Sequence, residues 1–530
     1  MSLELQEYIF EKKPKRRELL QYCAKEQPHK FKVQVFRNHS FELIEHTISV
    51  YLDYAGVGVS FSYSNYDDSF SFLDLDTSAD LVIVWIDGGR YPNICVQDFL
   101  TERLQALRAV TNQPVLVLPF RTDVSLSMAD VLTVNLSQLC AELGTELVDE
   151  RTLAATGTAL SSKAMLHVSK ALGLQYLPAL LQPTLKGLVV DFDNTLYQGV
   201  LGEDGIQGVT LTPGHKALQQ ELKQLAGQGF FLCAASKNEL EDVCKLLDQR
   251  ADFPLKREDF TKLCVSWQPK AESIEEIARY LNIHTDSLLF IDDNIGELTS
   301  VQMRHPQIRL LHAKEDAFTT LEVLRSYPGL LKLRSSSDDA KRSADVRSNE
   351  ERSQLRQTMS HSDYIKSLEL KLTYVLDDRT RISRVAELSN KTNQFIFNYK
   401  RYSEAEVEQL MSCEDTAVLT LSLSDRLSDS GLVGVFAGRR QDDRLELEEC
   451  FVSCRALGRG IDEIMVCGAI SILLKHFGVS QLHVQFQPGP RNKPAEAFVN
   501  EHLSEYCAEP MEFAYELPQD LLTISIFERN

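Results

Sequence analysis

The sequence lacks long apolar segments. Although 43% of its 530 residues are hydrophobic, its longest uninterrupted apolar runs fall well short of the roughly 18 residues that a membrane-spanning helix needs. The opening sequence MSLELQ also lacks the charged and apolar regions of a secretory signal. We therefore expect a cytoplasmic protein that has no membrane partner.

Paired cysteines and an excess of positive charge are also missing. The 11 cysteines include no C-x-x-C pair, which argues against a disulfide framework or a zinc site and favours free thiols in a reducing compartment. Acidic residues number 76 and basic residues 56, so the formal charge is −20. A surface of this sign repels phosphate backbones, and no nucleic-acid partner is expected.

The most informative segment present is GLVVDFDNT, residues 187–195. Its apolar run predicts a buried parallel strand, and Asp191 and Asp193 follow where that strand ends. Open α/β sheets bind ligands at this carboxyl edge. Two carboxylates about 4 Å apart repel by roughly 4 kcal/mol at an effective dielectric of about 20, which a hard cation would relieve. Mg²⁺ fits, because it binds through few carboxylates and leaves room for a phosphate oxygen.

Three further polar motifs follow at strand ends or helix starts. An apolar strand ends at Ser236, Lys270 stands at the mouth of a predicted helix over residues 271–281, and a third strand ends in Asp292 and Asp293. A lone D-x-D after a strand is more often an ordinary turn, but four motifs in this order indicate one site. A carboxylate nucleophile divides phosphoryl transfer into two steps, and a cation with a lysine stabilises charge on the transferring group.

These four motifs resemble those of the haloacid-dehalogenase-like phosphotransferases. The resemblance implies that Asp191 is the nucleophile and Asp193 the general acid and base. It also implies that Ser236 binds the phosphoryl group and that Lys270 offsets its charge. The implied Mg²⁺ ligands are Asp191, Asp193, Asp292 and Asp293, and the residues expected to contact substrate beside them are Thr195, Lys237, Asn238 and Asn294.

Length and pattern predict three domains, because 530 residues are too many for one core. Residues 1–180 alternate strand and helix signals and predict an α/β domain with a parallel sheet. Residues 185–333 form a Rossmann-like central domain. Only 43 residues separate Asp193 from Ser236, and 34 separate Ser236 from Lys270, so no large cap fits between them. Such an open site implies either a bulky substrate or a lid from a flanking domain.

The remaining sequence predicts a polar connection and an α+β domain. Residues 334–363 are strongly polar and predict a linker or a solvated connecting helix. Within residues 364–530, the sequence RALGRG at residues 455–460 follows a strand and precedes a helix. It resembles the pyrophosphate loop of GNAT-type acyltransferases, since glycines at a helix start expose amides that bind phosphate or a pantetheine arm. The alternative is a GNAT-like domain that binds no cofactor.

In the first domain, Ser40 follows a predicted strand as the nucleophile of an SGNH-type hydrolase does. The likeness is superficial, because no Gly-Asp-Ser sequence surrounds Ser40 and His167 lacks the Asp-x-x-His context. We therefore interpret Ser40 and His39 as structural or site-lining residues of an SGNH-like α/β domain.

Over nearly the whole chain the motifs resemble those of FkbH-like proteins. The likeness rests on the four phosphotransferase motifs and on GVLGEDG, KTNQF and SCRALGRG at residues 199–205, 391–395 and 453–460. It is weakest before residue 180. It departs at Tyr197 and Gln198, where Trp-Gly is usual, and at residues 424–430, which lack an expected glycine.

The resemblance implies a bifunctional acyltransferase and phosphatase of polyketide pathways. Such an enzyme takes a three-carbon acyl group, glyceryl or lactyl, from 1,3-bisphosphoglycerate or a related phosphate. It loads that group, dephosphorylated, onto the phosphopantetheine thiol of an acyl carrier protein. Residues 12–17 form the densest basic segment, which is either a solvated helix start or, with Arg459, a docking site for an acidic carrier. Further residues expected to contact substrate or carrier are Asn393, Gln394, Arg455, Gly458 and Gly460.

Acyl transfer needs a nucleophile of its own. If Asp191 attacked the phosphorus of an acyl phosphate, P–O cleavage would leave a carboxylate and lose the activation of the acyl group. The Asp191 site is therefore expected to remove the ester phosphate, while a thiol of the carrier or of the enzyme captures the acyl group. Cys454 is the best-placed cysteine, because Arg455 and a following helix start favour a thiolate. The alternative for Cys454 is a small buried residue.

Two other functions stay open. One is a simple Mg²⁺-dependent phosphohydrolase of a small or protein-bound phosphate, and the other is a non-catalytic scaffold that keeps the fold. The complete phosphotransferase motifs argue against the scaffold. The glycine loop and the TNQF sequence argue against the simple hydrolase.

Overall fold

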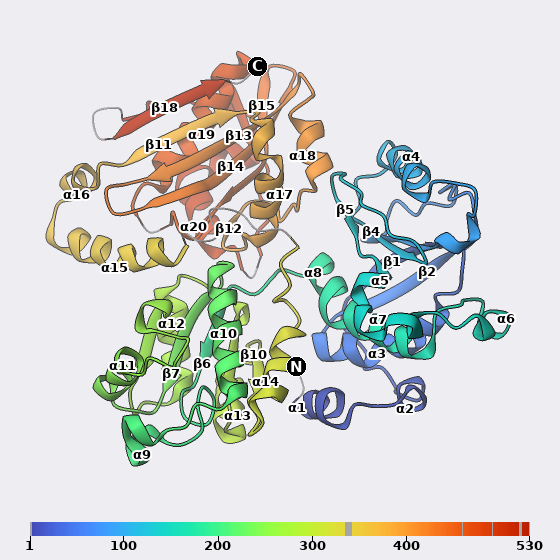
Figure 1. The fold of residues 1–530 in the computed structure, drawn as a ribbon. Helices are drawn as coiled ribbons and strands as arrows, with labels where there is room; N and C mark the ends of the chain where they lie inside the picture. Colours follow the sequence, from blue (N-terminus) through green and yellow to red (C-terminus); the bar gives the residue numbers. More distant parts are fainter. Residues whose placement is uncertain (1–2, 334–341, 458, 490, 519–521, 529–530) are drawn as a thin grey trace.

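The computed structural model builds three separate β-sheets, each with helices packed on it (Figure 1). The structure describes residues 3–333, 342–457, 459–489, 491–518 and 522–528. Among these residues, no helix combines the length and the apolar character needed to cross a membrane.

The first sheet is parallel throughout, with the strand order β2-β1-β3-β4-β5. Strand β3 is buried along its whole length, and its alternate residues join two apolar clusters on opposite faces, as in a sheet covered by helices on both sides. The strands are β1 (Lys30–Arg37), β2 (Gly58–Tyr66), β3 (Leu81–Asp87), β4 (Val115–Phe120) and β5 (Val131–Thr133). Helices α3 (Glu42–Ala55) and α7 (Ser162–Ala171) cover one face, and α4 (Val96–Arg108) covers the other.

The central sheet is also parallel, with the order β10-β9-β6-β7-β8. The chain moves from β6 to one side and then returns to the other, so β6 and β9 flank the switch point where such sheets bind ligands. Its strands are β6 (Gly187–Val190), β7 (Phe231–Ser236), β8 (Lys262–Val265), β9 (Leu288–Asp292) and β10 (Arg309–His312). Helices α10 (Pro213–Gly227) and α14 (Ala317–Arg325) cover one face, and α12 (Lys270–Tyr280) and α13 (Ile295–Arg304) cover the other.

The predicted parallel α/β architecture is confirmed for both sheets. Between β6 and α10 the chain forms only a short loop and α9 (Leu201–Gly208), so no cap domain is inserted there. This open design follows from the short motif spacing, which leaves room for crossover helices alone.

The third sheet is mixed, with the order β17-β16-β15-β14-β13-β11-β18. Strands β11, β13, β14 and β15 are antiparallel neighbours, whereas β15 and β16 run parallel, which agrees with the predicted α+β pattern. Its strands are β11 (Lys371–Leu376), β12 (Phe395–Ile396), β13 (Thr416–Ser424), β14 (Asp429–Gln441), β15 (Arg444–Val452), β16 (Gln481–Val484), β17 (Met511–Glu512) and β18 (Thr523–Glu528). Helix α19 (Asp462–Phe477) covers one face, and α17 (Ile382–Lys391) and α18 (Glu404–Leu410) cover the other.

The third sheet and its helices pack against the amino edge of the central sheet. The Asn282 side chain donates to the carbonyl oxygen of Cys454 at 3.0 Å, and Arg491 pairs with Asp286 at 2.7 Å. Asn282 and Asp286 both precede β9, so these contacts lie at the end of the central sheet opposite its carboxyl edge. In Figure 1 this unit, coloured orange to red, lies above the green central sheet.

Over its described part, the polar segment before the third sheet is a helix, which is the second of the two predicted alternatives, but two of its charged residues are buried. Residues 342–358 form helix α15 (Arg342–Thr358), in which Asp345 and Arg352 are buried. Arg352 and Arg459 both pair with Asp425 at 2.9 Å, and Arg459 also pairs with Asp345 at 2.9 Å. Two positive and two negative charges cancel, which is what allows their burial. Residues 334–341 of this segment lie outside the described residues.

Replacing Asp425 by Asn tests this buried network. We expect the local unfolding free energy of β14 and β15 to fall by about 3 kcal/mol, because two buried arginines then share one carboxylate. Hydrogen–deuterium exchange of these strands is the measurement. The matched control is Asp415→Asn, at an exposed pair with Arg440, where we expect a change below about 1 kcal/mol. Equal, small changes in both variants would contradict a stabilising role for the network.

Candidate active site

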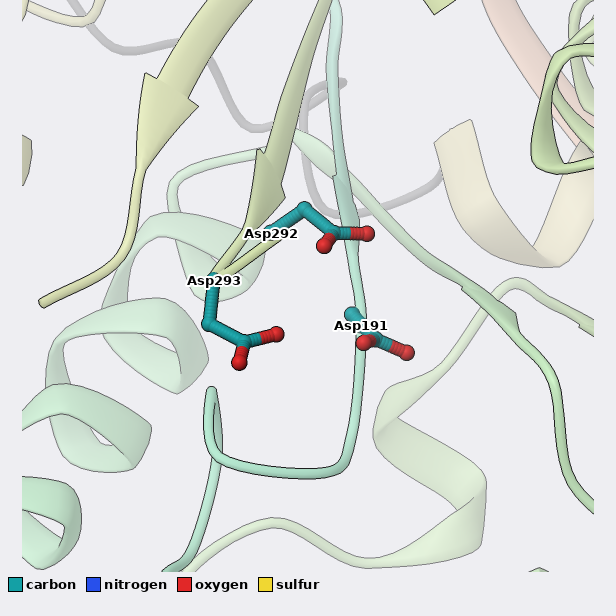
Figure 2. A group of neighbouring side chains, drawn as sticks. All are labelled: Asp191, Asp292 and Asp293. Atoms are coloured by element: carbon teal, nitrogen blue, oxygen red, sulfur yellow. The ribbon is translucent and has the colours of Figure 1, made fainter. Parts of the chain in front are cut away.

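Charged side chains from two strand ends and one helix meet at the carboxyl edge of the central sheet. Asp191 follows β6, Asp292 ends β9, and Asp293 comes next in the chain; their carboxylates converge in Figure 2. Lys270, the first residue of α12, places its Nζ 2.8 Å from Asp191 Oδ2 and 2.6 Å from Asp292 Oδ2. Asp191, Lys270, Asp292 and Asp293, which are far apart in the sequence, therefore lie side by side in the structure.

The site carries more negative charge than its lysine neutralises. Burial, and then the charge of Asp191, raise the pKa of Asp292 to about 7. The same two causes raise the pKa of Asp293. Burial disfavours the ammonium of Lys270, but Asp191 and Asp292 outweigh it and raise the pKa of Lys270. Three carboxylates around one ammonium leave a net negative charge that favours a cation.

The residues fit a hard divalent cation. Oxygen atoms of Asp191, Asp292 and Asp293 lie within 4.8 Å of one another. Asp191 Oδ1 is buried and has no hydrogen-bond partner among the described residues, so it is an acceptor that a cation would satisfy. An all-oxygen set of few carboxylates matches the preference of Mg²⁺.

Asp193 lies outside this carboxylate group, contrary to the prediction that it is a metal ligand. Its Oδ1 accepts hydrogen bonds from the hydroxyl of Tyr197 at 2.6 Å and the amide of Leu201 at 3.0 Å. Its Oδ2 accepts one from Asn238 Nδ2 at 3.0 Å. The donors to Oδ1 both lie between β6 and α10, whereas the donor to Oδ2 follows β7 and also contacts Ser236, so Asp193 stays beside the site.

Four further predicted site residues, Ser236, Thr195, Lys237 and Asn294, lie around the carboxylates. Ser236 is buried at the end of β7, where Asn238 Nδ2 also donates to its Oγ at 3.2 Å. Thr195 is buried, and its hydroxyl has no partner among the described residues. Lys237 pairs with Glu297 of α13 at 2.6 Å. The side chain of Asn294 caps α13 by accepting from Gly296 N at 2.8 Å, and its contact with substrate stays a prediction.

Sequence reasoning missed the role of Tyr197. The difference from the usual Trp-Gly at this position was visible, but nothing in the sequence says that a side chain four residues after Asp193 returns to it. The chain turns back after Asp193 and forms a β-bridge between Asp193 and Tyr197, which brings the buried phenol next to the Asp193 carboxylate. Burial and the charge of Asp193 raise the pKa of Tyr197 well above its usual value, so its hydroxyl stays a donor.

The described residues of the predicted pyrophosphate loop are closely packed. Strand β15 ends at Val452 and α19 begins at Asp462, and the negative side chain of Asp462 in the first turn disfavours a second anion there. A Cβ added to Gly460 would lie 2.8 Å from Cε1 of His361, so α16 (His361–Leu368) covers the loop. Gly458 lies outside the described residues.

The arginines of this loop are structural. Arg459 is buried in the ion-pair network with α15, so it is not available for docking a carrier. Arg455 is also buried and donates to Ser453 Oγ and to the carbonyl oxygen of Leu432, both at 3.4 Å. The observed contacts of Arg455 are structural, and its contact with substrate or carrier stays a prediction.

The KTNQF sequence fills a gap in the third sheet. Strands β15 and β16 pair only as far as Leu447 and Val484, and beyond that point β12 pairs with β15 instead. Arg401 donates to the side chain of Asn393, and Gln394 is half-buried beside β12. These residues lie far from the carboxylates of the central sheet, and their observed contacts are structural.

Cys454 lies at the contact between the third and central sheets, not in the Asp191 site. It packs against the apolar cluster around α12, beside the carbonyl contact with Asn282. Because Lys270 begins α12 and Asn282 follows its end, Cys454 and Asp191 lie at opposite ends of a helix about 16 Å long. Cys454 also stands eight residues before α19, so the predicted help from a helix start is absent.

His39 and Ser40 have structural partners. His39 stacks on Trp85 with 4.7 Å between ring centroids, and its Nδ1 lies 2.9 Å from the hydroxyl of Thr158. Burial lowers the pKa of His39 to about 3, which keeps the ring neutral. Ser40 donates to Glu42 at 2.7 Å and not to a histidine. This agrees with the structural interpretation of both residues.

Comparison with known proteins gives no family model and no curated protein that matches this sequence. Among solved structures, the N-terminal part of a Bacteroides fragilis protein, containing a phosphatase domain and complexed with Mg, is similar at 19% identity. It covers 60% of this chain and 98% of that chain, with a TM-score of 0.48. A HAD-family enzyme from Bacteroides thetaiotaomicron, complexed with magnesium and inorganic phosphate, is similar at 14% identity, covering 25% and 95% of the two chains with a TM-score of 0.20. These values are too low to bear on function, which is inferred from the site itself.

Cation binding at the three carboxylates predicts a pH-dependent effect on stability. The pKa of Asp292 in the folded chain, about 7, lies above the value of about 3.9 for an unfolded aspartate. The stabilisation from its proton is therefore complete below about pH 4 and is lost as the pH rises through about 7. Because Mg²⁺ competes with that proton, we expect MgCl2 to raise Tm more at about pH 8 than at about pH 5.

Thermal unfolding of matched variants checks this effect. Asp292→Asn should abolish the Mg²⁺-induced shift, whereas Asp248→Asn, at an exposed position of α11 (Leu240–Gln249), should retain it. A shift that is independent of pH, or that survives Asp292→Asn, would place the cation elsewhere.

Proposed function

We propose that this chain is a Mg²⁺-dependent phosphatase that uses Asp191 as its nucleophile, within a bifunctional acyltransferase and phosphatase of the FkbH-like kind. One observation carries the phosphatase proposal: Lys270 bridges Asp191 and Asp292, with Asp293 beside them, at the carboxyl edge of a parallel sheet. This combination supplies a nucleophile, a charge partner and a cation site in one place.

The residues divide the proposed reaction between them. Lys270 holds Asp191 Oδ2 and so orients the carboxylate toward the phosphorus. Ser236, at the end of the neighbouring strand β7, donates its hydroxyl to a phosphoryl oxygen, and Lys270 offsets the charge that develops there. Asp193 gives a proton to the leaving oxygen and later takes one from the attacking water. A bound Mg²⁺ would supply the positive charge that the three carboxylates and the phosphate need.

The open mouth of the site supports a large substrate, such as a phosphorylated group on a protein. Four large apolar side chains are exposed on segments that follow the carboxyl ends of strands around this edge, and Trp267 is the most exposed of them at 68%. An exposed apolar rim is typical of a protein-binding surface. The third sheet packs on the opposite edge and is no lid for this site. The rim residues are Leu240, Trp267, Ile295 and Phe318.

For acyl transfer we propose the thiol of an acyl carrier protein as the nucleophile. The motif resemblance supports a carrier that receives a three-carbon acyl group from 1,3-bisphosphoglycerate or a related phosphate. Cys454 is the less favoured nucleophile, because it is packed between two sheets about one helix length from Asp191.

A simple Mg²⁺-dependent phosphohydrolase is the second candidate. The observation that favours it is the covered glycine loop, whose Gly460 faces His361 and whose Arg459 is buried in ion pairs. A domain closed in this way has no evident place for a pantetheine arm among the described residues.

The Asp191→Asn variant separates these functions. Incubation with 1,3-bisphosphoglycerate, Mg²⁺ and a panel of carrier proteins, followed by intact-protein mass spectrometry, should give a dephosphorylated three-carbon acyl group on a carrier with the natural enzyme. With Asp191→Asn we expect the acyl group to keep its phosphate, because the amide is a poor nucleophile toward phosphorus.

Controls make each outcome informative. Asp248→Asn should behave like the natural enzyme. Release of phosphate without acylation of any carrier would support the simple hydrolase, and loss of all transfer in Asp191→Asn would contradict separate sites for the two reactions.

Substitution of Trp267 tests whether the rim binds a protein. We expect Trp267→Ser to lower kcat/KM for a carrier-borne phosphate by about tenfold, since exposed tryptophans often dominate protein interfaces. For free 4-nitrophenyl phosphate kcat/KM should change little. The control is Met303→Ser, which alters an 80% exposed side chain near the end of α13 that lies away from the rim residue Ile295. This variant should change kcat/KM for neither substrate. An equal loss for both substrates would mean that Trp267 supports the site and not docking.

A further inference from the structure

Asp193 has an unusually complete set of hydrogen-bond donors on one of its two oxygens. The hydroxyl of Tyr197 donates to Oδ1 at 2.6 Å, and the amide of Leu201 donates to the same atom at 3.0 Å. A carboxylate oxygen has two lone-pair sites in its plane. Both sites of Oδ1 are therefore occupied, which leaves no place on this atom for a transferable proton.

The other oxygen faces the reaction. Oδ2 accepts one hydrogen bond, from Asn238 Nδ2 at 3.0 Å, and the same amide donates to Ser236 Oγ at 3.2 Å. Oδ2 thus lies on the side where Ser236 would hold a phosphoryl group. It keeps one lone-pair site for a proton.

Tyr197 is held rigidly in this role. Its ring is buried and packs against Phe253, with 5.9 Å between centroids. A bridge between Asp193 and Tyr197 and a second, antiparallel bridge between Gln198 and Thr210 close the loop that carries it. The hydroxyl is consequently presented at a fixed place, which is what a preorganised site requires.

We propose that Tyr197 is a positioning residue that assigns the catalytic proton to Oδ2 of Asp193. The proposal rests on the phosphatase function inferred for this site.

The proton is accounted for in both half-reactions. An oxygen of Asp191 attacks the phosphorus, the bond to the leaving oxygen breaks with its electron pair on that oxygen, and the proton of Asp193 Oδ2 moves to it. A water oxygen then attacks the phosphorus while Oδ2 takes a proton from that water. The bond between phosphorus and Asp191 breaks, phosphate leaves, and both carboxyl groups return to their starting state.

Dependence on the leaving group tests the proposal. Tyr197→Phe keeps the ring and deletes the hydroxyl, so one lone-pair site of Asp193 Oδ1 becomes open to the proton, which is then shared between the two oxygens. An alkoxide needs the proton in order to leave, whereas 4-nitrophenolate leaves without it. We expect the ratio of kcat/KM for ethyl phosphate to kcat/KM for 4-nitrophenyl phosphate, measured with Mg²⁺, to fall by about tenfold in the variant.

A matched control removes a comparable bond outside the site. The hydroxyl of Tyr22 donates to the buried carboxylate of Asp53 at 2.9 Å in the first unit of the chain. Tyr22→Phe should leave the ratio unchanged.

Each other outcome overturns the proposal. An equal loss for the two esters would show that Tyr197 only supports the fold, and no loss would show that Asp193 is oriented without it. If the natural enzyme hydrolyses neither ester, the phosphatase function fails and the role of Tyr197 fails with it. If the natural enzyme hydrolyses both but the ratio is unmoved in Tyr197→Phe, only the role of Tyr197 is lost.

Discussion

The repulsion between three neighbouring carboxylates is the constraint on which the rest of the site depends. Oxygens of Asp191, Asp292 and Asp293 lie within 4.8 Å of one another, and Lys270 supplies the one ammonium that bridges two of them. Each such repulsion amounts to roughly 4 kcal/mol at about 4 Å and an effective dielectric of about 20. The buried apolar strands β6 and β9 hold these charges together. Cation binding is therefore coupled to the folded sheet, because an unfolded chain does not assemble the three ligands.

The central sheet uses its two edges for different purposes. Its carboxyl edge gathers the charged residues and stays open, while its amino edge carries Asn282 and Asp286, which bind the third sheet. Helix α12 connects the edges, with Lys270 at one end and the contact to Cys454 just beyond the other. The carboxylate site and the contact with the third sheet are therefore separated by the length of α12, about 16 Å. An intermediate shared by two activities would have to cross that distance on a mobile arm.

The sequence predicts where strands end better than it predicts which single contact a side chain makes. The carboxyl-edge cluster was predictable, because apolar runs that end in Asp191, Ser236 or Asp292 read as neighbouring parallel strands, whose ends meet at one edge. Roles decided by a single contact were not predictable. The sequence does not reveal that Asn294 caps α13, nor that Tyr197 donates to Oδ1 of Asp193. Such choices depend on side-chain directions that residue spacing does not specify.

The burial of charges in the polar segment before the third sheet was likewise not predictable, because their partners are far away in the sequence. A run of charges with few apolar residues predicts exposure, yet Asp345 and Arg352 are buried because Asp425 and Arg459 arrive from distant strands and loops with matching charge. That match also holds Arg459 in the network, and His361 of α16 lies against Gly460. A glycine loop with nearby arginines therefore need not be a phosphate site. With α15 and α16 in place, the carboxylate cluster of the described residues is the one that Asp191, Asp292 and Asp293 form at the carboxyl edge of the central sheet.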